Sequence, residues 1–121
     1  MIYGVLGPKT FDGQDYTNYE HVKTLLSSFQ DATKLISGGS KGVERLVEDY
    51  AKEANIELAI IPPDMTKHRQ NLAAFTMRNI AIMQASDVLI IFWDGRNNPA
   101  LLEAMSSSMQ SQREVYLIPM K

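Results

Sequence analysis

The amino-acid sequence predicts an α/β protein, a three-layer α/β/α sandwich around a mainly parallel, five-stranded sheet. Five short apolar segments alternate with four longer ones in which apolar residues recur at helical spacing. The short segments are nearly continuous apolar runs, which is typical of strands that helices cover on both faces. The length of 121 residues fits one domain, residues 1–121.

The first strand is expected at residues 2–6, where an apolar run ends at the turn signal Gly7-Pro8. The first helix follows a capping box, in which Glu20 stands three residues after a threonine N-cap at Thr17. Apolar residues then recur at helical spacing. The second strand, residues 33–37, runs directly into a turn rich in glycine.

The second helix is expected to begin at Gly42, because the apolar positions from Val43 to Ala54 follow the helical period. The third strand, residues 56–61, stops at Pro62-Pro63, since proline cannot donate a hydrogen bond to a neighbouring strand. Residues 64–71 are polar and are predicted to form a loop.

The third helix is expected over residues 72–85. Its predicted inward-facing residues are Leu72, Phe75, Thr76, Ile80 and Met83. The fourth strand, residues 87–93, is a nearly continuous apolar run. After a polar break, Pro99 suits the first position of a helix with Asn98 as its N-cap. The last strand is expected at residues 115–118.

Composition excludes several classes of function. A formal net charge of −2 argues against binding to bulk nucleic acid. The absence of cysteine excludes disulfides, thiolate metal ligands and cysteine nucleophiles. His21 and His68 lack partners at metal-ligand spacing, so we expect neither a metal nor a cofactor. The N-terminus lacks the features of a signal peptide, and the longest apolar run, residues 88–93, is too short to cross a membrane. A cytoplasmic protein is expected.

The candidate site centres on the stretch Ser37-Gly38-Gly39-Ser40-Lys41-Gly42, between the second strand and the second helix. Glycine accepts positive φ and lets a ligand approach the bare backbone, and the start of a helix attracts phosphate. The spacing matches neither G-x-G-x-x-G nor the P-loop. A plain tight connection between strand and helix therefore remains the alternative.

Three loops that follow strands carry small or polar residues. They are Gly7-Pro8-Lys9-Thr10, Ser37 to Gly42, and Asp94 to Asn98. Ligands of open α/β sheets bind beyond the carboxyl ends of the strands, where the strand order reverses. With the usual strand order 3-2-1-4-5, all three loops meet at one crevice.

Side chains of these loops and of the third helix have two interpretations each. Lys9, Thr10 and Lys41 contact a phosphate or are solvated loop residues. Arg78 holds a phosphate with two parallel hydrogen bonds, or it pairs with a carboxylate at the surface.

Two residues at the end of the fourth strand also have two interpretations each. Trp93 stacks on a base or closes the core with its N–H at the rim. Asp94 accepts hydrogen bonds from a ribose, or it closes an Asx-turn next to Gly95.

Four motifs follow one another along the chain: Gly7, Lys9, Thr10, Phe11 and Asp12; Ser37 to Gly42 with Glu44 and Arg45; Arg78 and Asn79; and Asp87 to Gly95. In this order they resemble the small YspA-type branch of the SLOG superfamily. That superfamily also contains the Lonely-Guy phosphoribohydrolases and the Rossmann-like domains of DprA and Smf. The resemblance spans nearly the whole chain.

The resemblance implies a Rossmann-like fold and a homo-oligomer that binds a nucleotide or a nucleotide-derived molecule. Relatives are proposed to sense, process or sequester such molecules in conflicts between bacteria and mobile elements such as phages. The residues expected to bind the ligand are Gly7, Lys9, Thr10, Ser37, Gly38, Gly39, Ser40, Lys41, Gly42, Glu44, Arg78, Asn79, Trp93, Asp94, Gly95 and Asn98. The chain departs from the family at residues 96–99, where a Gly-Thr pair is usual, and it lacks the late Lonely-Guy catalytic motif.

The segment from Ser86 to Met105 is also similar to the late part of the nucleoside 2-deoxyribosyltransferases. That second resemblance implies an enzyme in which Glu103 attacks the anomeric carbon of a nucleoside sugar. Asp94 or Asp12 would then be the general acid. A third possibility is a regulatory domain that acts with a protein partner, which an exposed apolar patch on the last helix would support.

Overall fold

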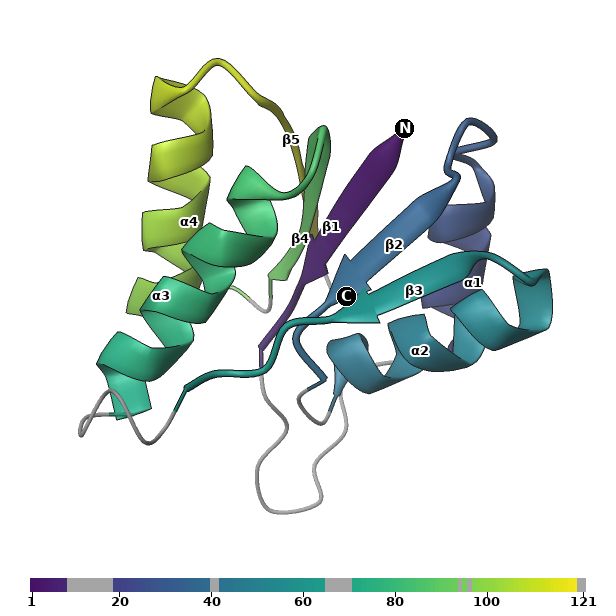
Figure 1. Ribbon diagram of the computed structural model, residues 1–121, viewed down its shortest axis with the longest axis horizontal. Helices are drawn as coiled ribbons and strands as arrows, with labels where there is room; N and C mark the ends of the chain where they lie inside the picture. The colour runs from purple at the N-terminus through teal and green to yellow at the C-terminus, as the bar shows by residue number, and fades with distance from the viewer. Residues whose placement is uncertain (9–18, 40–41, 65–70, 94, 96, 120–121) are drawn as a thin grey trace.

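The computed structural model describes residues 1–8, 19–39, 42–64, 71–93, 95 and 97–119. Strands and helices alternate along this chain (Figure 1). The strands are β1 (Ile2–Leu6), β2 (Lys34–Ser37), β3 (Glu57–Ile60), β4 (Val88–Trp93) and β5 (Glu114–Pro119). The helices are α1 (Tyr19–Ser27), α2 (Val43–Ala54), α3 (Asn71–Gln84) and α4 (Pro99–Gln110). The expected elements are present with slightly shifted bounds, and the capping box at Thr17 lies outside the described residues.

All five strands pair in parallel, in the order β3-β2-β1-β4-β5. This is the expected order, and it makes β1 and β4 the neighbours between which the direction of the crossovers reverses. The register aligns Gly4 of β1 with Ile36 of β2 and with Leu89 of β4. The predicted α/β architecture is therefore confirmed.

Helices cover both faces of the sheet, so the molecule has three layers (Figure 1). On one face, Val22 and Leu26 of α1 and Val47 of α2 pack against sheet residues such as Val5 and Ile90. The other face carries α3 and α4 in contact with each other. There, the buried core residues are Leu6, Ile36, Ile82, Met83, Leu89, Ile91, Leu101 and Ala104.

Two expectations about burial were wrong. The outer strands β3 and β5 are not covered on both faces: Ile60 and Leu117 are 41% and 43% exposed. Each of these strands has a neighbour on one side only, and for that reason β5 can also include Pro119.

The inward face of α3 also differs from the prediction. Its buried residues are Ala74, Arg78, Asn79, Ile82 and Met83. Phe75, Thr76 and Ile80, which were expected to face inward, are only half-buried. Apolar residues occupy most of the circumference of this helix, so its hydrophobic pattern does not select one face. Within the described residues, no helix is both long and apolar enough to cross a membrane.

Candidate functional site

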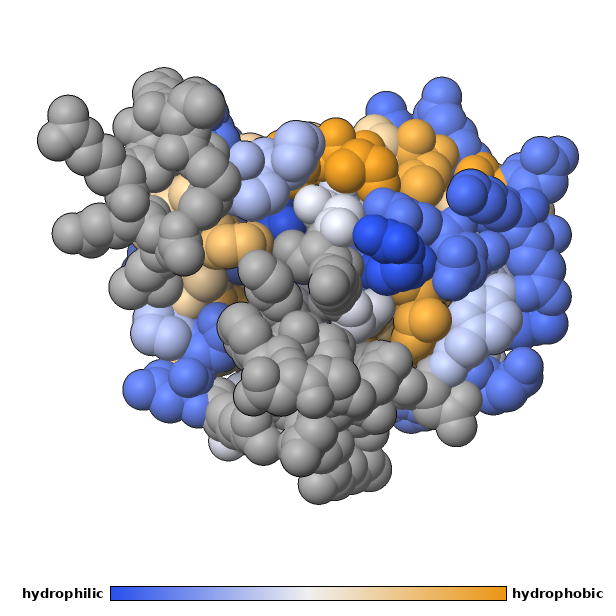
Figure 2. Space-filling model, turned by 90° about the horizontal axis from the view of Figure 1, so that it is seen from below, coloured by the Kyte–Doolittle hydropathy of each residue, from blue (hydrophilic) through white to orange (hydrophobic). Residues whose placement is uncertain are grey.

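The carboxyl ends of β2, β1 and β4 lie side by side, because these strands are neighbours in a parallel sheet. The loops that follow them therefore leave from the same edge of the sheet, as the sequence predicts. Figure 2 looks onto the molecule from below this edge. On the side of α1 and α2 the surface is mainly hydrophilic (Figures 1 and 2).

The turn after β2 is held by the buried hydroxyl of Ser37. Its Oγ donates a hydrogen bond to the carbonyl oxygen of Glu44 at 3.1 Å and accepts one from the amide N–H of Gly39 at 3.4 Å. Gly39 has φ 78° and Gly42 has φ 96°, a region that residues with a β-carbon rarely adopt. The two glycines therefore allow β2 to turn directly into α2.

The start of α2 has the features of an anion site. Gly42 is the N-cap residue and supplies no side-chain hydrogen bond to the first turn. Its carbonyl oxygen accepts from the amides of Arg45 and Leu46 at 3.1 and 3.3 Å. Because Gly42 has no side chain with which to cap this end of the helix, its first-turn N–H groups suit a phosphate. Val43 packs so closely on Gly7 that a β-carbon on Gly7 would lie 2.6 Å from it. This contact holds the end of β1 against the start of α2.

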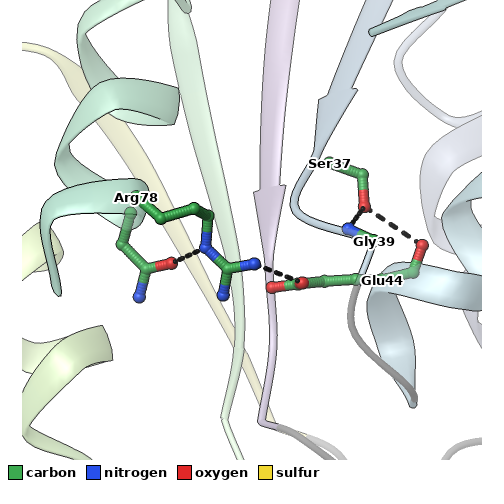
Figure 3. A network of polar contacts seen from close by, with 5 residues as sticks. Ser37, Gly39, Glu44 and Arg78 are labelled. Carbon is green, nitrogen blue, oxygen red and sulfur yellow. Dashed lines mark hydrogen bonds and ion pairs between the residues drawn. The ribbon is translucent and has the colours of Figure 1, made fainter. Parts of the chain in front are cut away.

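Arg78 and Glu44 form a buried ion pair between α3 and α2 (Figure 3). The distance from Nη1 of Arg78 to Oε1 of Glu44 is 3.1 Å, and the residues are 5% and 1% exposed. Nε of Arg78 also donates to Oδ1 of Asn79 at 2.7 Å. The guanidinium lies 5.0 Å from the centroid of the Phe75 ring. Burial lowers the pKa of Arg78, while the charge and hydrogen bond of Glu44 counteract this effect.

This pairing changes the interpretation of three predicted ligand residues, Glu44, Arg78 and Asn79. Arg78 was expected to bind a phosphate or to pair with a carboxylate at the surface. It pairs with a carboxylate, but in the interior. Asn79 is 1% exposed and accepts a hydrogen bond from Arg78.

Trp93 at the end of β4 and the residues that follow it contact mainly neighbouring parts of the protein. Trp93 is half-buried and lines a small apolar pocket. The other lining residues are Ile91, Leu101, Leu102, Met105 and Leu117. Asn98 is the N-cap of α4, as predicted, and its side chain accepts from the amide of Leu101 at 3.3 Å. Gly95 has φ 86° and a β-carbon there would meet nothing within 4 Å.

Glu103 lies on the exposed side of α4, whose buried residues are Ala100, Leu101, Ala104 and Ser108. Among the described residues, no hydrogen bond or ion pair links it to Glu44 or Arg78. Five of the expected ligand residues lie outside the described residues, as does Asp12: Lys9, Thr10, Ser40, Lys41 and Asp94. No group of three or more potential metal ligands occurs in the described ranges.

The ion pair itself was not predicted, although the sequence carries a signal for it. Glu44 shares a helical face with Val47 and Ala51, and Arg78 shares one with Ala74 and Ile82. All four of these neighbours are buried. A charge at a core-facing position is rarely buried without a partner of opposite charge. Two such positions in one chain therefore indicate a pair.

The parallel sheet, its strand order and the glycine turn after β2 define a Rossmann-like α/β domain. More particularly, residues 13–68 match the profile of the YspA, cpYpsA-related SLOG family. This match confirms the expected SLOG resemblance.

A comparison of structures supports the same fold. The chain superposes on DNA processing protein A (DprA) from Streptococcus pneumoniae with a TM-score of 0.74 and 14% sequence identity. The similarity covers 97% of this chain and 50% of that one, so the chain spans about half of the DprA structure. A comparison with curated proteins gives no match.

Proposed function

We propose that this protein binds a small nucleotide or nucleotide-derived ligand at the carboxyl edge of the sheet, as a sensor or a sequestering protein. The observation that carries the proposal is the turn from β2 into α2. Gly39 and Gly42 adopt positive φ there, and Gly42 is the N-cap residue of α2 and has no capping side chain. A phosphate would lie on residues 37–42, with the sugar and base toward Trp93 and Asp94.

The SLOG match supports this choice of ligand class. By the same resemblance, the protein would act in conflicts between bacteria and mobile elements such as phages. The location that we propose is the cytoplasm. No resident cofactor or metal belongs to the proposal, and neither bulk nucleic acid nor a membrane is a proposed partner.

Ligand capture tests the proposal directly. The purified protein is incubated with a mixture of nucleoside monophosphates, cyclic nucleotides and ADP-ribose derivatives. Mass spectrometry then analyses both the free solution and the pool that denaturation releases from the protein. We expect one compound to be recovered intact from the protein. Recovery of none of them, from protein shown to be folded, would contradict the proposal.

Two variants separate loss of the site from loss of stability. Gly39→Val places a β-branched residue at φ 78° in the glycine turn. Asn55→Val places the same residue at φ 56°, at the far end of α2. Both changes strain the backbone. Only Gly39→Val should abolish capture of the ligand; equal loss in both variants would mean that the turn is not the site.

The rival interpretation is an enzyme that cleaves or exchanges an N-glycosidic bond through Glu103. The exposed position of Glu103 leaves its carboxylate accessible to a ligand. In the capture experiment, this enzyme would release a free base into solution. That product should disappear in Glu103→Gln, which keeps the shape of the side chain and removes the nucleophile.

We further propose that two copies associate through β5 and α4. The exposed large apolar side chains on these elements are Leu102, Met109, Tyr116 and Leu117. β5 is an outer strand, and such strands pair readily with another chain. Light scattering should show a dimer that Leu117→Asp converts to a monomer. Ile60→Asp, on the opposite outer strand and equally exposed, is the control. A monomeric wild-type protein would favour a different protein partner for this surface.

A further inference from the structure

The Arg78–Glu44 pair connects the two helical layers of the molecule. Glu44 belongs to α2, which packs on one face of the sheet, and Arg78 belongs to α3, which packs on the other. Figure 3 shows the two side chains pointing toward one another. The pair therefore lies where both layers meet the carboxyl edge of the sheet, next to the turn after β2.

The turn after β2 is in contact with this pair on two sides. A β-carbon on Gly38 would lie 1.8 Å from Nη1 of Arg78 and 2.7 Å from Oε1 of Glu44. The backbone of Glu44 is bonded to Ser37, whose Oγ also accepts from the amide of Gly39. The positions of residues 37–39 therefore depend on the positions of Arg78 and Glu44.

We propose that Arg78 and Glu44 are positioning residues, which act on a ligand by holding the Ser37–Gly39 turn rather than by contacting it. Arg78 is held by Glu44 and Asn79 through hydrogen bonds and lies over the ring of Phe75. Both side chains are almost completely buried. The effect on ligand binding rests on the proposed function, whereas the effect on the turn does not.

Three variants test this role. Arg78→Met and Glu44→Met each remove one charge and leave the other buried without its partner, which is strongly unfavourable. The double variant removes both charges and fills the space with apolar groups, which proteins tolerate better. If the pair positions the turn, the double variant resembles the wild type in amide exchange of the turn and in ligand affinity more than either single variant does. If Arg78 instead contacts the ligand, the double variant binds no better than Arg78→Met.

The control is the exposed ion pair between α1 and α2. Nζ of Lys23 lies 2.6 Å from Oε1 of Glu53, and the two side chains are 40% and 49% exposed. Lys23→Met removes the positive charge that pairs with Glu53 of α2, and it changes no residue of the turn after β2. Its effect on residues 37–39 should be negligible.

The first readout needs no ligand. Hydrogen exchange of the Gly39 amide, which donates to Oγ of Ser37, is followed by NMR and should accelerate about tenfold or more in each single variant and recover in the double variant. The amides of β4 report whether the core is still folded. Unchanged exchange at Gly39 in Arg78→Met would overturn the proposal.

The second readout is the dissociation constant of adenosine monophosphate as the probe. It should rise in the single variants and recover in the double variant together with the exchange rates. Loss of binding in the double variant despite normal exchange would make Arg78 a ligand contact and refute the positioning role. If the wild type does not bind the probe but exchange behaves as expected, the positioning role stands and the proposed ligand class is wrong.

Discussion

Gly38 lies directly against the guanidinium of Arg78. The space that a β-carbon of Gly38 would occupy is within 2.4 Å of Cζ of Arg78. The backbone of Gly38 is outside the left-handed region, unlike that of Gly39, where φ is 78°. Two adjacent glycines are therefore required for different reasons. Gly38 leaves room for a side chain from α3, and Gly39 provides a backbone angle.

This difference predicts how alanine acts at the two positions. Gly38→Ala should lower the free energy of unfolding by about 1–3 kcal/mol, because the new methyl group overpacks against Arg78. The loss should shrink when Arg78 is also changed to alanine. Gly39→Ala should cost about 1–2 kcal/mol through backbone strain, with or without Arg78. Urea denaturation of the two glycine variants, of Arg78→Ala and of the two double variants measures both effects. If Arg78→Ala reduced the losses from Gly38→Ala and Gly39→Ala by the same amount, this account would be wrong.

The buried ion pair predicts that losing one of its charges lowers the free energy of unfolding more than losing both. Arg78→Met should lower the free energy of unfolding by about 3–5 kcal/mol, because Glu44 is then a buried charge without its cation. The double variant with Glu44→Met should lose less than Arg78→Met alone. Lys23→Met, in the exposed pair, should change the free energy of unfolding far less, because solvent screens that pair. Urea midpoints decide the outcome, and strictly additive losses would show that the two buried charges are independent.

Most of the fold could be predicted from the sequence, because each element has a local signal. Asn98-Pro99 marks the start of α4, and the N-cap hydrogen bond of Asn98 is present in the structure. The apolar run of β4 predicts a strand buried on both faces, and residues 88–92 are buried. The alternation of strands and helices then leaves few arrangements, and the usual strand order is the one observed.

The details of the site could not be predicted in the same way, because they depend on contacts between distant segments. Arg78 and Glu44 are 34 residues apart and meet only after α2 and α3 pack on opposite faces. The face of α3 that turns inward was also ambiguous, since Phe75 and Ile80 are as apolar as Ala74 and Ile82. The helix turns the smaller Ala74 and the charged Arg78 inward because Glu44 is there to receive the guanidinium.

The cap of α4 predicts a difference between neighbouring asparagines. Asn98→Ala removes the acceptor for the amide of Leu101 and should cost about 1 kcal/mol of stability. Asn97→Ala changes an exposed residue just outside the helix and should cost little. Thermal unfolding of both variants makes the comparison. If Asn98→Ala also weakened ligand binding while Asn97→Ala did not, Asn98 would serve the site as well as the helix.

Alkaline pH should destabilise the protein through Tyr3. Tyr3 is 4% exposed, and its hydroxyl donates a hydrogen bond to Oδ1 of Asp31. Burial, followed by this hydrogen bond and the charge of Asp31, raises the pKa of Tyr3 above its ordinary value. The unfolded chain therefore loses the Tyr3 proton near pH 10, while the folded protein still holds it. The contribution of protonated Tyr3 to the free energy of unfolding is therefore complete below about pH 10. It is lost as the pH rises from there toward the pKa of Tyr3 in the folded protein.

Tyr3→Phe isolates this effect, because phenylalanine keeps the ring that packs 5.0 Å from Phe29 and lacks the ionisable hydroxyl. At neutral pH the variant should be less stable by about 1 kcal/mol, the cost of one lost hydrogen bond. Above about pH 10 the stability of the wild type should fall more steeply than that of the variant, so that the two curves converge. Urea denaturation across this range measures the slopes. Parallel curves would show that Tyr3 ionises in the folded protein as readily as in the unfolded chain.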